Sequence, residues 1–215
     1  VYEVYMKRGI TYHIIGKSKN SLNDLDKAVD MSPQEVRLYM LRARIKADLG
    51  DKNGAFKDFA KAIEYKPDFV EAYITRGLYK LQSYDKEGAL QDLTKALKID
   101  SNKVTAYIVI SDIKSAMGDK KGAFQDLEKA LTIEPNNVDI YIKRSEVKLS
   151  MGNKKGALQD LTTAIALNPQ QPKAYIERCL IKIHLNDKNG CCSDFKKARQ
   201  LGWKVPEREL EAFCK

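Results

Sequence analysis

The chain has 215 residues, of which 43% are hydrophobic and 31% are charged, and its formal net charge is +9. This balance excludes an intrinsically disordered chain, and no stretch approaches the roughly 18 consecutive apolar residues that a membrane-spanning helix needs. The chain opens at Val1 without an initiator Met or a signal peptide, which is compatible with removal of an upstream targeting segment or of further repeats.

A short motif recurs along the chain with a fixed spacing. Gly-Ala followed by Phe or Leu begins at Gly54, Gly88, Gly122 and Gly156, each 34 residues after the last. Extending this spacing predicts six repeats, at residues 2–35, 36–69, 70–103, 104–137, 138–171 and 172–205. A period of this length is typical of solenoid proteins, in which each repeat buries its apolar face against its neighbours.

Each repeat predicts two helices in the same order. The first helix has a tyrosine at the fourth position of the repeat and a small residue at the eighth, as at Tyr73 and Gly77. The second begins behind a capping side chain, which is Asp51, Asp85, Asp119, Asn153 or Asp187, whose oxygen can accept a hydrogen bond from a free backbone N–H. Its end is marked in four repeats by proline, which lacks the N–H that a continuing helix would need. The small residues predict a closely packed antiparallel pair.

Tyr73-x2-Arg76-Gly77-x2-Lys80, followed by Ala89-x3-Leu93-x2-Ala96, resembles the tetratricopeptide repeat (TPR) pattern, with tyrosine in place of its usual tryptophan. The resemblance covers essentially the whole chain, with Tyr84 departing from the usual turn glycine and Ser101 from the terminal proline. It implies an all-α fold, a right-handed α-solenoid (superhelix) of antiparallel helix pairs. We expect a single domain over residues 1–215.

The C-terminal segment predicts a lid on the last repeat. Pro206 can occupy the first turn of a helix, so we expect a capping helix over residues 206–215 that covers repeat six with Leu210 and Phe213. By its resemblance to the endings of bacterial TPR proteins, some of which are exported, this segment also favours a bacterial origin.

All the cysteines lie in this last part of the chain. Cys191 takes a buried alanine position and is interpreted as a small core residue. Cys192 should face the capping helix, which carries Cys214, so one interpretation is a Cys192–Cys214 disulfide and the other is a set of reduced thiols. A disulfide would favour a bacterial periplasm or cell envelope over the cytoplasm.

No catalytic, metal or cofactor site is predicted. His13 and His184 lie in the first and last repeats and cannot converge on one metal ion or one nucleophile. Gly16-Lys17-Ser18 echoes the end of a phosphate-binding loop, but Thr11 stands where that motif requires glycine. We therefore expect a protein that is not an enzyme.

Charged residues recur at two positions of the repeat. Arginine occupies the seventh position and aspartate the twenty-third, and these are expected to form a structural ion-pair ladder: Arg8, Arg42, Arg76, Arg144 and Arg178 with Asp24, Asp58, Asp92, Asp160 and Asp194. Exposed pairs of this kind contribute about 0.2–1 kcal/mol each. Repeat four has Ile110 in place of arginine, so Asp126 needs another partner.

The TPR resemblance implies a ligand groove lined by the first helices. Its fifth and ninth positions give the candidate peptide-binding residues Met40, Arg44, Ile74, Leu78, Ile108, Asp112, Ile142, Glu146 and Ile176. An apolar strip with charged side chains suits an extended or helical peptide, although the fifth-position side chains could instead be half-buried between repeats. TPR proteins that bind chaperones hold a C-terminal carboxylate with Lys at the fifth position and Asn at the ninth. This chain has neither residue at its respective position, so binding of a chaperone's C-terminal carboxylate is not expected.

The positive charge is predicted to lie away from this groove. The groove positions are near neutral, and the excess lysines lie at the eleventh position and in the turns. We expect the turn lysines to form a solvated edge, with contact to an anionic surface as the alternative. A groove without an excess of basic side chains disfavours binding of a nucleic acid, because its phosphates would have no cationic partners. The sequence therefore predicts a non-catalytic protein-interaction scaffold that binds a peptide segment or partner helix. A homo-oligomerising module and, with less support, an RNA-binding solenoid are the alternatives.

Overall fold

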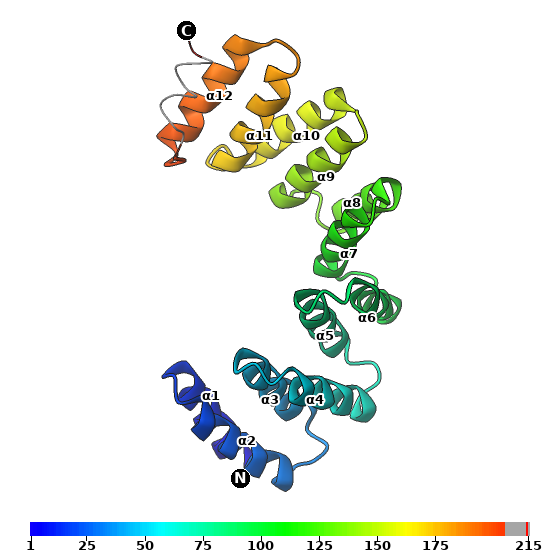
Figure 1. Cartoon of the computed structure of the whole chain (residues 1–215), viewed down its shortest axis with the longest axis vertical. Coiled ribbons are helices and arrows are strands. Elements are labelled where there is room, and N and C mark those ends of the chain that lie inside the picture. Colours follow the sequence, from blue (N-terminus) through cyan, green and yellow to red (C-terminus); the bar gives the residue numbers. More distant parts are fainter. Residues whose placement is uncertain (205–213, 215) are drawn as a thin grey trace. The chain divides into compact units, whose positions relative to one another are not determined.

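In the computed structural model, which describes residues 1–204 and 214, the chain is all-helical and the described residues form no strand. The helices are α1 (Tyr2–Ile14), α2 (Ser18–Met31), α3 (Val36–Asp48), α4 (Lys52–Tyr65), α5 (Val70–Gln82), α6 (Lys86–Ile99), α7 (Val104–Ala116), α8 (Lys120–Ile133), α9 (Val138–Ser150), α10 (Lys154–Leu167), α11 (Pro172–Ile183) and α12 (Lys188–Gln200). Consecutive helices pair as hairpins (Figure 1). This confirms the predicted fold class. The predicted capping helix lies outside the described residues.

The chain divides into two compact units, Val1–Ala106 and Tyr107–Lys215, with the boundary inside α7. In unit 1, α1 packs with α2, α3 with α4 and α5 with α6, while α2 contacts α3 and α4 contacts α5. In unit 2, α9 packs with α10 and α11 with α12, and the contacts of α8 with α9 and of α10 with α11 join successive hairpins. Among the described residues, no helix is long and apolar enough to cross a membrane.

Small residues allow the two helices of a hairpin to approach closely. A Cβ atom on Gly77 of α5 would lie 3.2 Å from Leu93 Cγ and 3.3 Å from the carbonyl oxygen of Ala89, both on α6. A side chain at this position of α5 would require these neighbours to shift by a few tenths of an ångström. The space beside each crossing is filled by one large side chain from the second helix, at most 4% exposed in every hairpin: Leu25, Phe59, Leu93, Leu127, Leu161 and Phe195.

Capping and tyrosine hydrogen bonds fix the ends of the hairpins. The Asp85 carboxylate accepts a hydrogen bond from the backbone N–H of Gly88 at 2.8 Å, and equivalent caps occur at Asp51, Asp119, Asn153 and Asp187. At the other end, the Tyr39 hydroxyl donates to the carbonyl of Pro33 at 2.8 Å, and Tyr73, Tyr141 and Tyr175 repeat this bond with the preceding prolines. The recurrent tyrosine thus ties each of these first helices to the loop before it.

Candidate functional site

The charged residues of the hairpins form two-point contacts across each helix pair. In the hairpin of α5 and α6, Arg76 donates from Nε and Nη2 to the two carboxylate oxygens of Asp92, at 2.8 and 2.6 Å. The same paired geometry joins Arg8 to Asp24, Arg42 to Asp58, Arg144 to Asp160 and Arg178 to Asp194. The predicted ladder residues therefore lie in contact.

The lysines at the eleventh position of the repeat lie against the aspartates of the twenty-third position. Each lies close to a ladder aspartate: Lys46 to Asp58, Lys80 to Asp92, Lys114 to Asp126, Lys148 to Asp160 and Lys182 to Asp194, with Nζ–Oδ distances of 2.6–3.0 Å. They reach the carboxylate because a residue four places after the arginine lies on the same face of the helix. In repeat four, Lys114 pairs with Asp126, and Ile110, which stands in place of the arginine, is buried in the core.

These contacts hold the ladder inside the fold. The aspartates are at most 6% exposed, and the guanidinium of Arg42 also reaches Asp26 of the preceding hairpin at 2.8 Å. The hydrogen bond from Arg8 holds the pKa of Asp24 below its ordinary value because it favours the ionised carboxylate. The ladder thus joins the two helices of each of these hairpins through buried carboxylates.

The face formed by the first helices, hereafter the first-helix face, is less apolar than the fifth-position residues suggest. Met40 and Ile142 are buried, with 9% and 2% exposure, and Ile74, Ile108 and Ile176 are half-buried. Ile74 packs beside Val70 and Tyr73 of its own helix. The fifth-position side chains therefore contribute first to packing of the hairpins.

The ninth-position residues are more accessible. Arg44, Asp112 and Glu146 are exposed and Leu78 is half-buried. In unit 2, Lys143 of α9 pairs with Asp112 of α7 at 2.7 Å, and Lys173 of α11 pairs with Glu146 of α9 at 2.9 Å. These pairs link successive first helices and neutralise much of the charge on this face.

A pocket of about 170 Å³ opens on the first-helix face of unit 1, between α1 and α3. Its lining combines apolar and ionisable side chains: Ile10, His13, Leu41, Arg44, Ile45 and Asp48. His13 Nε2 lies 3.4 Å from Asp48 Oδ2, so this contact bridges the two helix ends. The pocket offers a small apolar recess with charged groups at its margin.

A second pocket, of about 100 Å³, lies beside the first between α3, α4 and α5, and shares Asp48 with it. Phe56 and Tyr79 also line it. Burial, and then the negative charge of Asp48, raise the pKa of the Tyr79 hydroxyl. His13 and Tyr79 were not among the predicted site residues.

Comparison with known proteins agrees with this architecture. A family model described as tetratricopeptide repeat matches residues 2–35, 36–69 and 104–137. The chain is a tetratricopeptide repeat protein. TPR proteins are protein-interaction scaffolds that bind proteins or peptides, and they are generally non-catalytic.

Several solved TPR structures share the fold of this TPR protein at low sequence identity. PilF of Pseudomonas aeruginosa is 15% identical with a TM-score of 0.76, over 98% of this chain and 96% of that one. MamA is 23% identical with a TM-score of 0.69, over 80% and 98%. YrrB, described as a TPR protein with an unusual peptide-binding site, is 15% identical with a TM-score of 0.68, over 88% and 96%. A search of curated proteins found no match.

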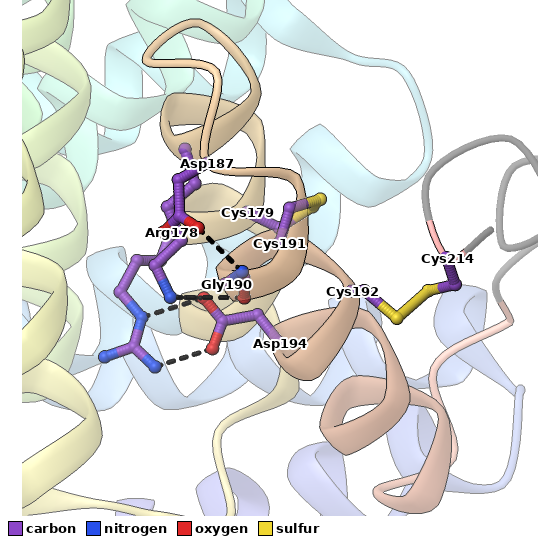
Figure 2. The surroundings of a disulfide bond; sticks show 9 residues. Arg178, Cys179, Asp187, Gly190, Cys191, Cys192, Asp194 and Cys214 are labelled. Carbon is purple, nitrogen blue, oxygen red and sulfur yellow. Dashed lines mark hydrogen bonds and ion pairs between the residues drawn. A yellow bond between two sulfur atoms is a disulfide. The ribbon is translucent and has the colours of Figure 1, made fainter.

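The three cysteines of the last TPR hairpin and Cys214 form two disulfides (Figure 2). Cys192 on α12 is bonded to Cys214, with their Cα atoms 5.1 Å apart. Cys179 on α11 is bonded to Cys191 on α12, and both are fully buried. The second bond was missed because Cys191 was interpreted only as a core residue. The signal was present, since the eighth and twentieth positions of the repeat face each other in two other hairpins, at Gly77 and Ala89 and at Gly9 and Ser21.

Proposed function

We propose that this TPR protein is a non-catalytic scaffold that binds a peptide segment or a partner helix on its first-helix face. The observation that carries the proposal is the pocket between α1 and α3, whose apolar wall comes from Ile10, Leu41 and Ile45 and whose margin carries Arg44 and Asp48. Grooves of this kind take one apolar side chain of a peptide in the recess and fix its direction with a few polar groups.

The charges of unit 1 support a protein ligand over a nucleic acid. On its first-helix face, Asp48 lies beside His13, and Glu71 of α5 pairs with Lys103 at 3.3 Å. An RNA-binding groove needs an excess of basic side chains for the phosphates and free aromatic rings for the bases. The fourth-position tyrosines Tyr39 and Tyr73 are instead buried and hydrogen-bonded to prolines.

Arg44 is the best residue with which to test the proposal because it is exposed and lines the pocket. Substitution of Ile142 would instead disturb the core, since only 2% of that side chain is exposed. Peptides would be selected from a displayed random library against the wild-type protein, and their Kd values measured on purified variants.

We expect Arg44→Glu to weaken the selected peptides at least tenfold, about 1.4 kcal/mol, because it reverses the charge at the pocket margin. The matched control is Lys95→Glu, which makes the same charge change at an exposed position on α6, and it should leave the Kd values unchanged. If the selected peptides bound the wild type, Arg44→Glu and Lys95→Glu with equal Kd values, the first-helix face would not be the binding surface.

A further inference from the structure

The turns between paired helices in unit 2 expose large apolar side chains. Met117, Met151 and Leu185 occupy the fourteenth position of their repeats and are 50%, 43% and 47% exposed. Each follows the first helix of a hairpin directly or within two residues. Because stacked hairpins of one orientation place their turns at the same end of the helices, we treat these residues and the neighbouring lysines as one turn edge. The amine of Lys120 bonds the carbonyl of Ser150 at 2.5 Å, which joins two successive turns.

The same edge carries five exposed lysines: Lys120, Lys121, Lys154, Lys155 and Lys188. In the part of the chain that the structure describes, none of them forms an ion pair, whereas Lys114, Lys148 and Lys182 are held by ladder aspartates. The acidic residues in these turns, Asp119 and Asp187, cap α8 and α12. Five lysines against two aspartates leave the edge with a net charge of +3.

The corresponding edge of unit 1 provides a comparison inside the same chain. It also exposes apolar side chains, Ile15, Leu49 and Tyr84. Its lysines Lys17, Lys19, Lys52 and Lys86 are, however, balanced in number by Asp48, Asp51, Asp85 and Glu87. Among the described residues, the turn edge of unit 2 combines exposed apolar side chains with an excess of lysines over acidic residues, and that of unit 1 does not.

We propose that the turn edge of unit 2 docks on an anionic phospholipid membrane surface. Three half-exposed apolar side chains at the ends of helices suit the boundary between headgroups and acyl chains, and lysines beside them lie where anionic lipid headgroups would be. A nucleic acid would use the lysines but leave Met117, Met151 and Leu185 exposed to water, so the lipid surface accounts for more of the edge. This surface is separate from the first-helix face and does not depend on its function.

Flotation with vesicles tests the proposal. The wild-type protein should bind vesicles of phosphatidylglycerol and phosphatidylcholine, should not bind vesicles of phosphatidylcholine alone, and should lose binding as salt is added. The triple variant Met117→Ser, Met151→Ser, Leu185→Ser removes the exposed apolar side chains of the turn edge. The quadruple variant Lys120→Gln, Lys121→Gln, Lys154→Gln, Lys155→Gln removes the charge. Each should weaken binding to the anionic vesicles at least tenfold.

The matched control changes four exposed lysines of unit 1, as Lys19→Gln, Lys57→Gln, Lys95→Gln, Lys98→Gln, and should keep most of the binding. Circular dichroism would show that all variants are folded. No preference of the wild type for anionic vesicles would overturn the proposal, as would triple-variant binding equal to that of the wild type. Lysine-dependent binding of polyuridylate without any effect of the apolar triple would identify a nucleic-acid surface instead.

Discussion

At the scale of single residues, the ladder aspartates show how one buried carboxylate is satisfied by two cations. Asp58 is 3% exposed and receives both Arg42 and Lys46. Burying an ionised group is costly unless it is paired and hydrogen-bonded. The arginine occupies both carboxylate oxygens and the lysine adds a second charge, so the ladder can remain ionised inside the fold. Removing one carboxylate would leave two cations without their partner.

The pairing of Asp24 with Arg8 gives the ladder a pH dependence. The hydrogen bond from Arg8 lowers the folded-state pKa of Asp24 below the ordinary value of 3.8, so the ionised group stabilises the fold above that pH, and the stabilisation is lost as the pH falls through the folded-state pKa. We expect Asp24→Asn to lower the free energy of unfolding by about 2 kcal/mol at neutral pH and by much less near pH 2. Urea unfolding of both proteins at the two pH values measures this.

The control is Asp26→Asn, since the Asp26 side chain is 57% exposed and its pair with Arg42 should contribute about 1 kcal/mol or less. A wild-type advantage over Asp24→Asn that is the same at both pH values would contradict the account, because it would not come from ionisation of Asp24.

At the scale of structural elements, the turn between α5 and α6 has a non-glycine residue in the left-handed backbone conformation, as the turn before α12 has at Asn186. The backbone at Tyr84 has φ of 65°, where Gly16, Gly50, Gly118 and Gly152 have values of 76–87° in the corresponding turns. A Cβ atom makes this left-handed conformation costly by about 1–2 kcal/mol. The Tyr84 side chain is 91% exposed, so the fold gains no packing in return.

Tyr84→Gly should therefore stabilise the protein by about 0.5–1 kcal/mol, the strain relieved less the greater freedom of glycine in the unfolded chain. The midpoint of urea denaturation would rise without a change in slope. Ser83→Gly is the control, because Ser83 has φ of −94° and glycine there should destabilise the protein. A lower midpoint for Tyr84→Gly than for wild type would show that the turn is not strained.

The disulfide inside the last hairpin makes a second prediction at this scale. Alanine or glycine fills the positions of Cys179 and Cys191 in the hairpin of α3 and α4 and in that of α5 and α6, so Cys179→Ala, Cys191→Ala should keep the fold. Losing a cross-link that closes a loop of this length should cost up to about 3 kcal/mol. Denaturation would be followed with and without dithiothreitol in this variant and in the wild type.

The double alanine variant removes the Cys179–Cys191 bond and keeps the bond between Cys192 and Cys214. It therefore isolates the contribution of the Cys179–Cys191 bond. The wild type should unfold at a higher denaturant concentration than the variant under oxidising conditions, and the two should converge when reduced. Equal midpoints under both conditions would contradict the presence of the Cys179–Cys191 bond.

At the scale of the whole molecule, the helix pairs could be predicted because one period governs the entire sequence. The burial of individual groove residues could not be predicted from the sequence. Met40 and Ile142 occupy the same repeat position as half-buried Ile108, and their burial depends on the neighbouring side chains, which differ from repeat to repeat. The same holds for the pocket in unit 1, which needs the side chains of two successive first helices.

The central claim is that the first-helix face receives the ligand, and amide hydrogen exchange tests it most directly. A peptide selected against the wild-type protein would be added at saturating concentration, and exchange compared with the free protein. The account predicts slower exchange in α1 and α3, the helices that line the pocket, with little change in α2 and α4. Protection confined to α2, α4 and α6, with α1 and α3 unaltered, would contradict it.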